Sequence, residues 1–509
     1  MANKNKQEAF APYGAMAIPK GESRYSILRW GWGGLNSTDT IDSGNITDCS
    51  GVSINPPYVD SYADLMYTLY LTDQTVIGVY GFDDYFIVIY QSAAKKLYVM
   101  QVWNNGPSDF GSVTRELGNS ETNKHYDSNE PRSVVRFNAA VETENIVNAT
   151  YVKRILIYPD CFSFDLGYDE NFGRNVIGEA ANLNTEGSPQ PPIKYAAVYA
   201  SRLFGVDNNK IYASEFNNYA GWNLDTTDDI SEAHAWISMT QSNTKADGFF
   251  TGIYTYDNHI VLFKKDFTQL VYSDSNPFRI VDLTAYGAEN PNAYTEAEGV
   301  LYFASHDNVY AFTGGIPKSL GENLSIPDYT GVCLGSYKNK LYMSIGKVLY
   351  CYNSGVWSKR ELEHGIIQFA STDKGLYGLV DTRDKIVMVD SKKYEEHQNG
   401  LSYGDWWFET DLMCGGKMNI RRVKKLSLLC DIGENASVSV YLLNEGEEFN
   451  ENTSVRVLYG NKSGKRMLCG LIRGFCGYAH KLRICGTGKV RVHAAELLVS
   501  WGGDLYRSE

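Results

Sequence analysis

A pair of short strands recurs between residues 80 and 400 of this 509-residue chain, and no other feature restricts the fold as strongly. In each copy an apolar strand is followed by a polar turn and by a second strand in which tyrosine and aliphatic residues alternate. The clearest copies are Arg202–Val206 with Lys210–Ala213, His259–Phe263 with Gln269–Tyr272, and Lys340–Met343 with Val348–Tyr352. Alternation is typical of β-strands, whereas a helical repeat would space its apolar residues about 3.6 positions apart.

Seven copies are marked by one apolar residue each: Phe86, Ile155, Leu203, Ile260, Leu301, Leu341 and Leu376. Their spacings are 69, 48, 57, 41, 40 and 35 residues. A period near 40 with four short strands per copy is typical of propeller blades. We therefore predict an all-β chain with a β-propeller over residues 76–400, of seven blades, or of six or eight if residues 104–130 hide a hairpin. The longer spacings predict loop insertions at 104–130 and 217–247.

A propeller places its first and last blades side by side, so a distant segment is expected to complete one blade and remove the open edge. We assign residues 1–75 to an N-terminal arm that contains this closing segment. The candidates lie in residues 24–55, including Tyr25–Trp30 and Ile46–Asp48. The stretch Pro57–Leu71 is expected to include a short helix.

Residues 401–509 lack the paired unit but continue to alternate, for example in Val423–Cys430, Ala436–Leu443 and Val490–Val499. This pattern predicts a small antiparallel β-sandwich. Residues 405–509 carry 15 Lys and Arg against 12 Asp and Glu, a net charge of +3, which leaves −16 for residues 1–404. The difference either suits head-to-tail stacking of subunits or is incidental.

The overall composition excludes several classes of protein. A formal charge of −13 argues against a surface that grips nucleic acid, because such surfaces need Lys and Arg to neutralise phosphates. No stretch reaches the roughly 18 apolar residues of a membrane span, and the first residues lack the apolar core of a secretory signal. Nine cysteines without a CxxC pair predict free, mostly buried thiols in a reducing compartment.

The sequence contains no P-loop and no His-Glu-x-x-His motif, and its one Gly-x-Ser-x-Gly match, Gly400–Gly404, falls in the polar break before the C-terminal strands. The nearest approach to a metal cluster is Cys469, Cys476, His480, Cys485 and His493, whose spacing is too irregular for a zinc site. We therefore predict no catalytic, cofactor-binding or metal-binding residues and no cofactor.

A pair of carboxylates for glycoside hydrolysis is an open alternative, because the distance between two carboxylates is set by the fold. Asp225, Asp228, Asp229 and Asp282 are the candidates. The 37 tyrosines also have two interpretations, namely packing between strands and an aromatic surface for protein or sugar contacts.

The motifs, taken in order, resemble a group of bacteriophage tail proteins with propeller domains. The similar segments are Trp32–Asn36, Ile41–Gly44, Thr47–Asp48, Ser201–Val206, Lys210–Ser214, Trp222–Asn223, Val261–Asp266, Pro277–Ile280, Gly287–Ala288, Val300–Phe303, Val309–Phe312, Gly314–Ser319 and Trp407–Thr410. The chain departs from the pattern at Cys49–Val52.

This resemblance implies a non-enzymatic virion structural protein of the tail nozzle, ring, hub or packaged-DNA stabilisation type. Its expected location is the virion tail, near the head-to-tail connector or the tail tip, after assembly in the host cytoplasm. The expected partners are copies of itself in a cyclic oligomer, other tail or connector proteins and, transiently, the exiting DNA, which an acidic lumen would repel. The alternatives are a glycan-directed propeller, either a receptor-binding protein or a glycoside hydrolase, and a cellular scaffold that binds peptides.

Overall fold

The computed structural model describes residues 24–30, 32–37, 43–105, 109–118, 130–140, 151–184, 189–222, 235–239, 248–272, 278–284, 286–391, 401–414, 420–452, 454–473 and 475–501. All the regular secondary structure in these ranges is β-strand, and the strands form many small antiparallel sheets. The prediction of an all-β fold is confirmed. The same ranges contain no helix with the length and hydropathy that crossing a membrane requires.

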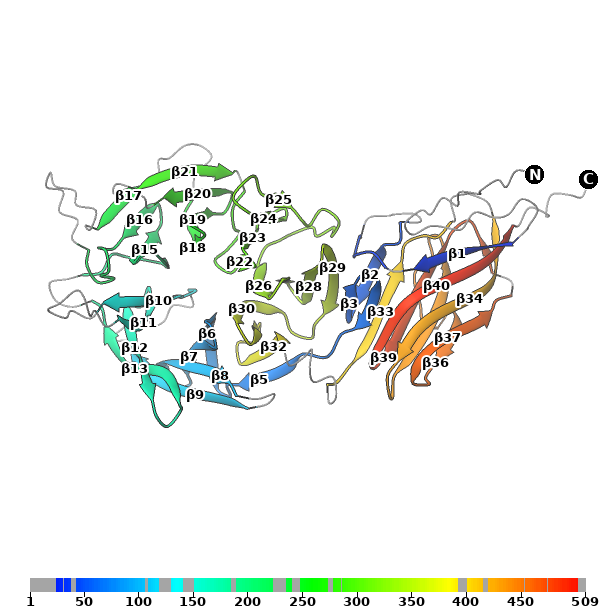
Figure 1. Ribbon diagram of the computed structural model, residues 1–509, viewed down its shortest axis with the longest axis horizontal. Helices are drawn as coiled ribbons and strands as arrows, with labels where there is room; N and C mark the ends of the chain where they lie inside the picture. The colour runs from blue at the N-terminus through cyan, green and yellow to red at the C-terminus, as the bar shows by residue number, and fades with distance from the viewer. Residues whose placement is uncertain are drawn as a thin grey trace, which may run out of the picture.

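Seven of the sheets have four antiparallel strands each, and Figure 1 shows them arranged around a common centre. Six of these sheets use strands that follow one another in the chain: β6 (Gln74–Gly81), β7 (Tyr85–Ser92), β8 (Leu97–Asn104) and β9 (Phe110–Gly118); β10 (Ser133–Ala140), β11 (Tyr151–Tyr158), β12 (Phe162–Asp169) and β13 (Arg174–Asn182); β14 (Tyr195–Tyr199), β15 (Arg202–Asp207), β16 (Lys210–Ala213) and β17 (Trp236–Met239); β18 (Phe250–Tyr256), β19 (His259–Lys264), β20 (Phe267–Tyr272) and β21 (Arg279–Thr284); β22 (Tyr294–Ala297), β23 (Val300–Ala304), β24 (Val309–Phe312) and β25 (Lys318–Ser319); β26 (Cys333–Tyr337), β27 (Lys340–Ile345), β28 (Val348–Asn353) and β29 (Val356–Glu361).

The seventh four-stranded sheet joins distant parts of the chain in the order β30 (Ile366–Thr372), β31 (Gly375–Val380), β32 (Lys385–Ser391) and β5 (Met66–Tyr70). Leu69 of β5 pairs with Ile386 of β32, and both pack in one apolar cluster. The expected helix in Pro57–Leu71 is therefore wrong, because this segment alternates and supplies an edge strand. The prediction that residues 24–55 complete a sheet of the repeat is also wrong, because that role falls to β5.

The repeated unit read from the sequence corresponds to these sheets. The seven marker residues all lie on the second strands of seven different sheets, namely Phe86 on β7, Ile155 on β11, Leu203 on β15, Ile260 on β19, Leu301 on β23, Leu341 on β27 and Leu376 on β31. All seven side chains are buried. The second strands are apolar on both faces because each of them packs between two neighbouring sheets.

Apolar clusters fill the junctions between adjacent sheets. Ile87 of β7 and Ile155 of β11 belong to one cluster, and Phe204 of β15 and Leu262 of β19 belong to another. The first and last four-stranded sheets also touch, since the rings of Phe86 and Tyr377 lie 4.5 Å apart. Neighbouring sheets therefore share their cores, including the pair that is most distant in sequence.

The two expected insertions are partly wrong. Residues 104–130 contain β9 and residues 217–247 contain β17, and each is the outermost strand of its sheet. The sequence of β9, which includes Thr114, Arg115 and Glu116, is typical of an outer strand with one face in water, whereas β17 is an apolar strand of only 4 residues. The rest of both insertions lies largely outside the described residues.

Two further antiparallel sheets combine strands from both ends of the chain. One contains β1 (Arg24–Trp30), β3 (Val52–Asn55), β4 (Tyr58–Ser61), β34 (Arg421–Ile432), β37 (Gly464–Leu471), β38 (Cys476–Gly477) and β40 (Val490–Trp501); the other contains β2 (Ile46–Ser50), β33 (Asp405–Thr410), β35 (Ser437–Asn444), β36 (Val455–Gly460) and β39 (His480–Thr487). Leu428 of β34 and Ile484 of β39 belong to one buried cluster, so the two sheets share a core. Residues 24–61 therefore contribute strands to these sheets and none to the repeat.

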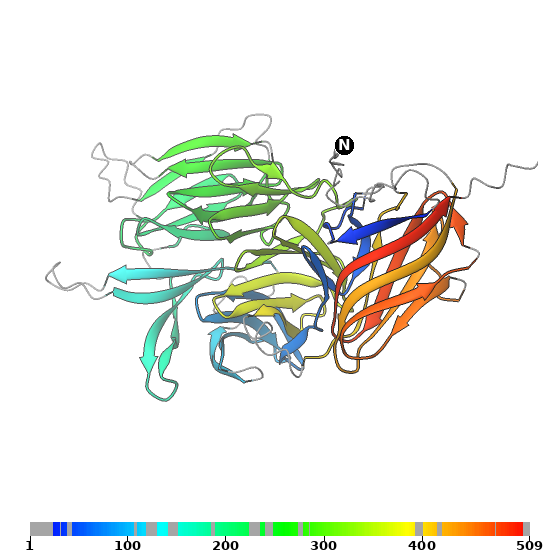
Figure 2. The ribbon, with the colours of Figure 1, turned by 45° about the vertical axis from the view of Figure 1, so that its right-hand side comes forward.

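The outer strand β29 joins the repeat to the two larger sheets. Cys49 of β2 is buried against β29, and the Asp48 carboxylate lies 2.5 Å from the Lys359 ammonium. Leu35 donates its backbone N–H to the Trp357 carbonyl at 2.8 Å. The buried cluster that includes Trp357 continues into the larger sheets. The two parts of the molecule therefore meet through a packed contact (Figure 2).

Substitution of Gly81 is expected to weaken the contact between the first and last four-stranded sheets. A Cβ atom at Gly81 would lie 1.9 Å from the carbonyl oxygen of Ser371 in β30, and backbone cannot give way as a flexible side chain can. We expect Gly81→Ala to lower the free energy of unfolding by about 1–3 kcal/mol, measured by chemical denaturation. Gly167→Ala is the matched control, because a Cβ there meets no atom within 4 Å. Equal stability of both variants would contradict the close contact.

Candidate functional site

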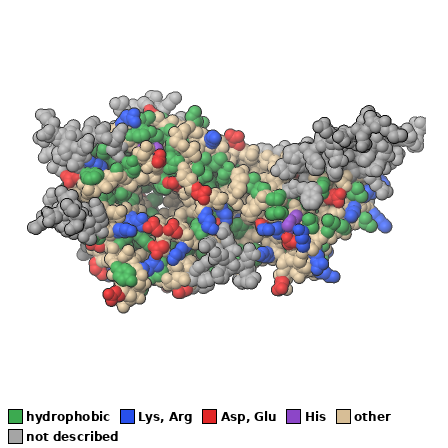
Figure 3. All heavy atoms as spheres, in the orientation of Figure 1, with side chains coloured by type: hydrophobic (Ala, Val, Ile, Leu, Met, Phe, Trp, Pro, Cys, Tyr) green, Lys and Arg blue, Asp and Glu red, His purple; other side chains and the backbone are tan. Residues whose placement is uncertain are grey.

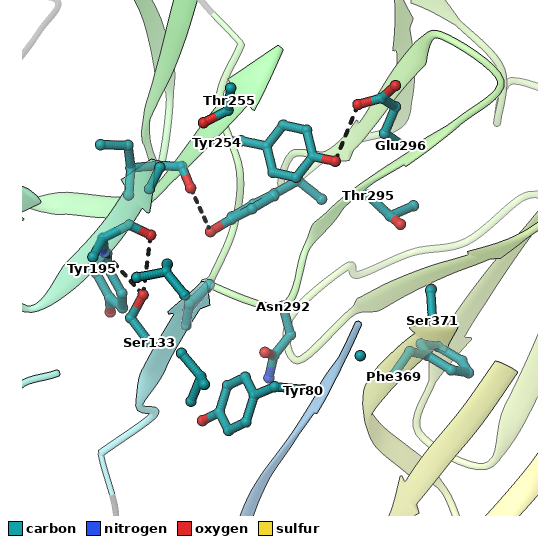
Figure 4. A pocket seen from close by; sticks show the side chains of 18 of the residues that line it. Tyr80, Ser133, Tyr195, Tyr254, Thr255, Asn292, Thr295, Glu296, Phe369 and Ser371 are labelled. Atoms are coloured by element: carbon teal, nitrogen blue, oxygen red, sulfur yellow. Dashed lines mark hydrogen bonds between the residues drawn. The ribbon is translucent and has the colours of Figure 1, made fainter. Parts of the chain in front are cut away.

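The first strands of all seven four-stranded sheets line one central cavity of about 530 Å³. These strands are β6, β10, β14, β18, β22, β26 and β30. Figure 3 shows the hollow at the centre of these sheets, and Figure 4 shows the side chains that surround it. A concave site of this size suits a small ligand, so the cavity is the candidate functional site.

Hydrogen bonds from lining side chains join neighbouring first strands around the cavity. Four lining side chains accept from a backbone N–H of the neighbouring segment: Tyr80 Oη from Arg132 at 3.1 Å, Ser133 Oγ from Ala196 at 2.9 Å, Ser371 Oγ from Ser336 at 3.3 Å and Gln368 Oε1 from Val79 at 3.1 Å. Three hydroxyls donate to a backbone carbonyl of the neighbouring strand: Thr255 Oγ1 to Val198 at 2.9 Å, Tyr294 Oη to Ile253 at 3.3 Å and Ser336 Oγ to Glu296 at 2.6 Å. These bonds cross all seven junctions. Much of the polar lining is thus committed to holding the sheets together.

Four tyrosines line the cavity and remain protonated at neutral pH. Burial raises the pKa of Tyr80 and Tyr294 above the ordinary value of 10, and it raises the pKa of Tyr195 to about 12. Burial, with the Glu296 carboxylate as a further cause, raises the pKa of Tyr254, whose hydroxyl donates to Glu296 Oε2 at 3.1 Å. These hydroxyls can donate hydrogen bonds but are poor bases or nucleophiles.

The charged lining side chains are Glu296, Arg132 and Arg136. Arg132 is fully buried against Asp160, with Nε 2.9 Å from Oδ2, and Arg136 lies 2.6 Å from Asp83. The hydrogen bond from Arg136 lowers the pKa of Asp83. Both arginines are therefore neutralised by aspartates, and Glu296 is the one carboxylate among the described lining residues.

The described lining lacks the pair of carboxylates that glycoside hydrolysis ordinarily uses. Glycoside hydrolysis ordinarily uses two carboxylates that flank the substrate, about 5–9.5 Å apart. The described lining has Glu296 alone and contains no His, Cys or Lys. Asp83, Glu298 and Asp373 lie beside a neighbouring hollow that shares Glu296, and Asp83 is held by Arg136.

Of the carboxylates proposed from the sequence, the structure describes Asp282, which does not line this cavity. Asp225, Asp228 and Asp229 lie outside the described residues. Asp282 lies on β21, the outermost strand of its sheet, where its carboxylate accepts from Gln269 Nε2 at 2.9 Å. Asp282 therefore supports a neighbouring strand.

The cysteines and histidines near the C-terminus have separate surroundings. Cys469 and Cys476 are exposed, and His493 Nε2 lies 2.7 Å from the Asp431 carboxylate. His480 is fully buried beside Phe475. In the part of the chain that the structure describes, no three His, Cys, Asp or Glu side chains are grouped so as to hold a metal ion.

The prediction of free, mostly buried thiols is confirmed. All nine cysteines are free, and six of them are buried. Burial raises the pKa of Cys49 and Cys351 to about 12, so these thiols are not activated nucleophiles.

Most of the cavity could not be predicted from the sequence, because the repeated pattern marks mainly the second and third strand of each unit. The first strands stand out less in the sequence because polar residues interrupt their apolar pattern, as Ser336 does in β26 and Gln368 in β30. A usable signal was present, since Tyr80, Tyr195 and Tyr254 each precede a marker residue by 6 to 8 positions. Recurrence of tyrosine at that offset indicates a lining position repeated by the fold.

No protein family model matches the chain, and no curated protein sequence matches it. Among solved structures, the chain is similar to two structures of the extracellular domain of BT4673 from B. thetaiotaomicron, described as part of a one component system and of a hybrid two component system. Both show 11% sequence identity and a TM-score of 0.39. The alignments cover 86% and 90% of this chain but 62% and 72% of the other chains. A likeness of this degree assigns no function.

The buried ion pair of Arg132 and Asp160 is expected to contribute far more to the free energy of unfolding than the exposed ion pair of Lys96 and Glu116. Asp160→Ala would leave the Arg132 guanidinium buried without its carboxylate, so we expect the free energy of unfolding to fall by about 3–5 kcal/mol. The exposed pair of Lys96 and Glu116 is the control, and Glu116→Ala is expected to cost less than about 1 kcal/mol. Chemical denaturation measures both, and similar losses would contradict the assignment.

His480 is expected to make stability depend on pH. Burial and, secondarily, the Arg421 guanidinium lower the pKa of His480 from 6.5 to about 4. As pH falls from 6.5 to 4, the His480 imidazole is protonated in the unfolded chain but stays neutral in the folded chain. The free energy of unfolding therefore falls by about 3 kcal/mol over this range. Below pH 4 this contribution stays constant.

The measurement is denaturation of the protein and of His480→Gln at several pH values between 7 and 4. The variant is expected to lose less stability over this range, because it has no imidazole to protonate. An unchanged pH dependence would contradict the role of His480.

Proposed function

We propose that this protein is a non-enzymatic structural component of a bacteriophage tail. In this proposal its copies form a ring on the tail axis, near the head-to-tail connector or at the tail tip, and help to build or close the exit channel for DNA. Other tail or connector proteins would bind the ring in the virion, after assembly in the host cytoplasm.

We also propose that the architecture is a seven-bladed β-propeller followed by a β-sandwich. Seven four-stranded sheets whose first strands line one cavity support the propeller. Two antiparallel sheets with a shared apolar core support the sandwich.

The observation that carries the functional proposal is the packed contact between the two parts of the molecule. One buried cluster includes Leu341 in the repeat, Trp357 in β29 and Leu428 in the larger sheets. The chain also crosses between the parts twice, because β1 to β4 belong to the larger sheets and β5 belongs to the repeat. A ring closes only if the angle between successive contact surfaces is kept constant, and a packed contact of this kind resists bending.

The central cavity supports a mechanical role rather than a passage for DNA within one copy. Its hydroxyl and amide side chains are largely used to join adjacent strands. A volume of about 530 Å³ suits a small molecule and is too small for a DNA duplex, whose major groove alone is about 12 Å wide. DNA would therefore pass between copies, along the axis of the ring.

The experiment is to purify particles produced by the genome that encodes this chain and to locate the chain by labelling and electron microscopy. We expect a fixed copy number at the tail, and we expect the purified chain to give class averages with rotational symmetry. Absence from the particle together with a monomeric purified chain would overturn the proposal.

The second candidate is a glycan-directed propeller, which one observation favours. Tyr254 and Glu296 lie hydrogen-bonded at the cavity wall, and an aromatic ring beside a carboxylate is suited to contacts with a sugar. Titration with oligosaccharides, followed by Glu296→Gln, tests it. Specific binding or cleavage that Glu296→Gln abolishes, in a chain that forms no rings, would favour this candidate.

A further inference from the structure

Strand β37 presents an apolar row to solvent at the edge of its sheet. Met467 and Leu471 are 66% and 83% exposed, and Cys469 between them is exposed as well. The three side chains share one face because successive residues of a strand alternate. Edge strands with exposed apolar side chains tend to pair with other chains unless something covers them.

The same edge is strongly basic. From Val455 to Arg473, through β36 and β37, the chain has no Asp or Glu but has five exposed cations: Arg456, Lys462, Lys465, Arg466 and Arg473. None of the five forms an ion pair with another residue of the described ranges. Tyr459, also exposed, lies under the Arg456 guanidinium at 5.3 Å. We call β36 and β37 with these cations the basic edge.

The hairpin of β12 and β13 has the complementary character. Figure 2 shows this hairpin projecting from the body of the molecule. At its tip, Tyr168 and Phe172 are 69% and 47% exposed. Asp169 and Glu170 lie between these aromatic residues, and neither is in an ion pair with a described residue.

The tip of the hairpin is held in a defined position. The Asp169 carboxylate accepts from the Asn171 N–H at 2.8 Å, which orders the turn. Phe172 packs edge-on against Trp103, with ring centroids 5.5 Å apart, and the Arg174 guanidinium lies 4.6 Å from the same indole. An ordered aromatic tip binds with a smaller entropic cost than a mobile loop.

We propose that the basic edge of one copy binds the tip of the β12–β13 hairpin of a second copy of this chain. This inference rests on the proposed function, because it names the contact through which copies would join. The tip would place Tyr168 and Phe172 on the row of Met467 and Leu471, and its carboxylates among the cations. Such a match in apolar surface and in charge is typical of specific interfaces.

The positions of the two surfaces fit a head-to-tail contact. In Figure 1 the hairpin and the basic edge lie on opposite sides of the molecule along its longest axis, so one copy cannot satisfy both. Different surfaces on successive copies generate a ring when the rotation closes. Edge-to-edge pairing of two basic edges would bring like charges together, which disfavours a two-fold dimer.

The loop between β35 and β36 is a second acidic surface, and it lies close to the basic edge of the same copy, with exposed Glu445, Glu448 and Glu451. Its one aromatic residue, Phe449, is only partly exposed, because it packs against Tyr441 at 5.0 Å and lies 4.2 Å from the Arg483 guanidinium, whereas Phe172 of the hairpin is 47% exposed. The loop therefore lacks the exposed apolar side chains that the hairpin offers.

A charge swap in the full-length protein tests the contact. One variant carries Lys465→Glu and Arg466→Glu, a second carries Asp169→Lys and Glu170→Lys, and a third combines all four. Sedimentation velocity over a range of concentrations measures association. We expect each two-residue variant to weaken association about tenfold or more, and we expect the combined variant to recover most of it.

Two control variants define the specificity. Lys210→Glu with Lys347→Glu removes two exposed cations outside the basic edge and is expected to leave association unchanged. Glu445→Lys with Glu448→Lys reverses the neighbouring acidic loop and is expected to have a small effect. Thermal unfolding of each variant checks that the fold is retained.

Two results would overturn the contact. One is failure of the combined variant to recover association. The other is a greater loss of association from the Glu445 and Glu448 variant than from the Asp169 and Glu170 variant. The result is separable from the proposed function. If rings form and the chain is found in the tail while the swap has no effect, this interface is wrong and the function stands. If the swap restores association of a chain that is absent from particles, the interface stands and the function is wrong.

Discussion

A four-stranded sheet of short strands has two apolar faces and can bury them only against other sheets. Strands β7 and β19 illustrate this, since nearly all of their side chains are buried although each belongs to a small sheet. The apolar clusters accordingly lie at the junctions between sheets, as between β7 and β11 and between β15 and β19. Burial of apolar area is the main favourable term in folding, so no single sheet of this size would be stable alone. The arrangement of sheets around a centre follows from this requirement.

The centre is where this arrangement becomes most constrained. Seven first strands approach closely, and several junctions leave no room for a side chain, as at Gly81 beside Ser371. Hydroxyl and amide side chains then satisfy backbone groups that the crowded wall would otherwise bury without partners. The cavity is therefore polar because of the demands of packing, and a polar lining by itself is weak evidence for a ligand.

The periodic part of the architecture could be predicted from the sequence because alternation is a local property. The markers Phe86 to Leu376 identified seven second strands, and the scattered cysteines were correctly expected to be free thiols. The outer strands β9 and β17 were not predicted, because β9 has the polar composition of a loop and β17 is only 4 residues long within a polar stretch. The lining carboxylate Glu296 could not be singled out from the sequence, because which side chains face the cavity depends on how the sheets are placed.

Local pattern by itself determined that this chain is built from β-strands, that a unit of about 40 residues repeats, and that basic and acidic charges separate along the sequence. Only the tertiary structure decided which strands pair across hundreds of residues. The hydrogen-bonding groups of the backbone are the same for every residue type and do not select a partner strand. Strand β5, rather than residues 24–55, pairs with the free edge of β32 because its Met66 and Leu69 pack on the apolar cluster that contains Ile386. Likewise, the charges of β36 and β37 form one surface, and those of the β12–β13 hairpin form another, only once the chain is folded.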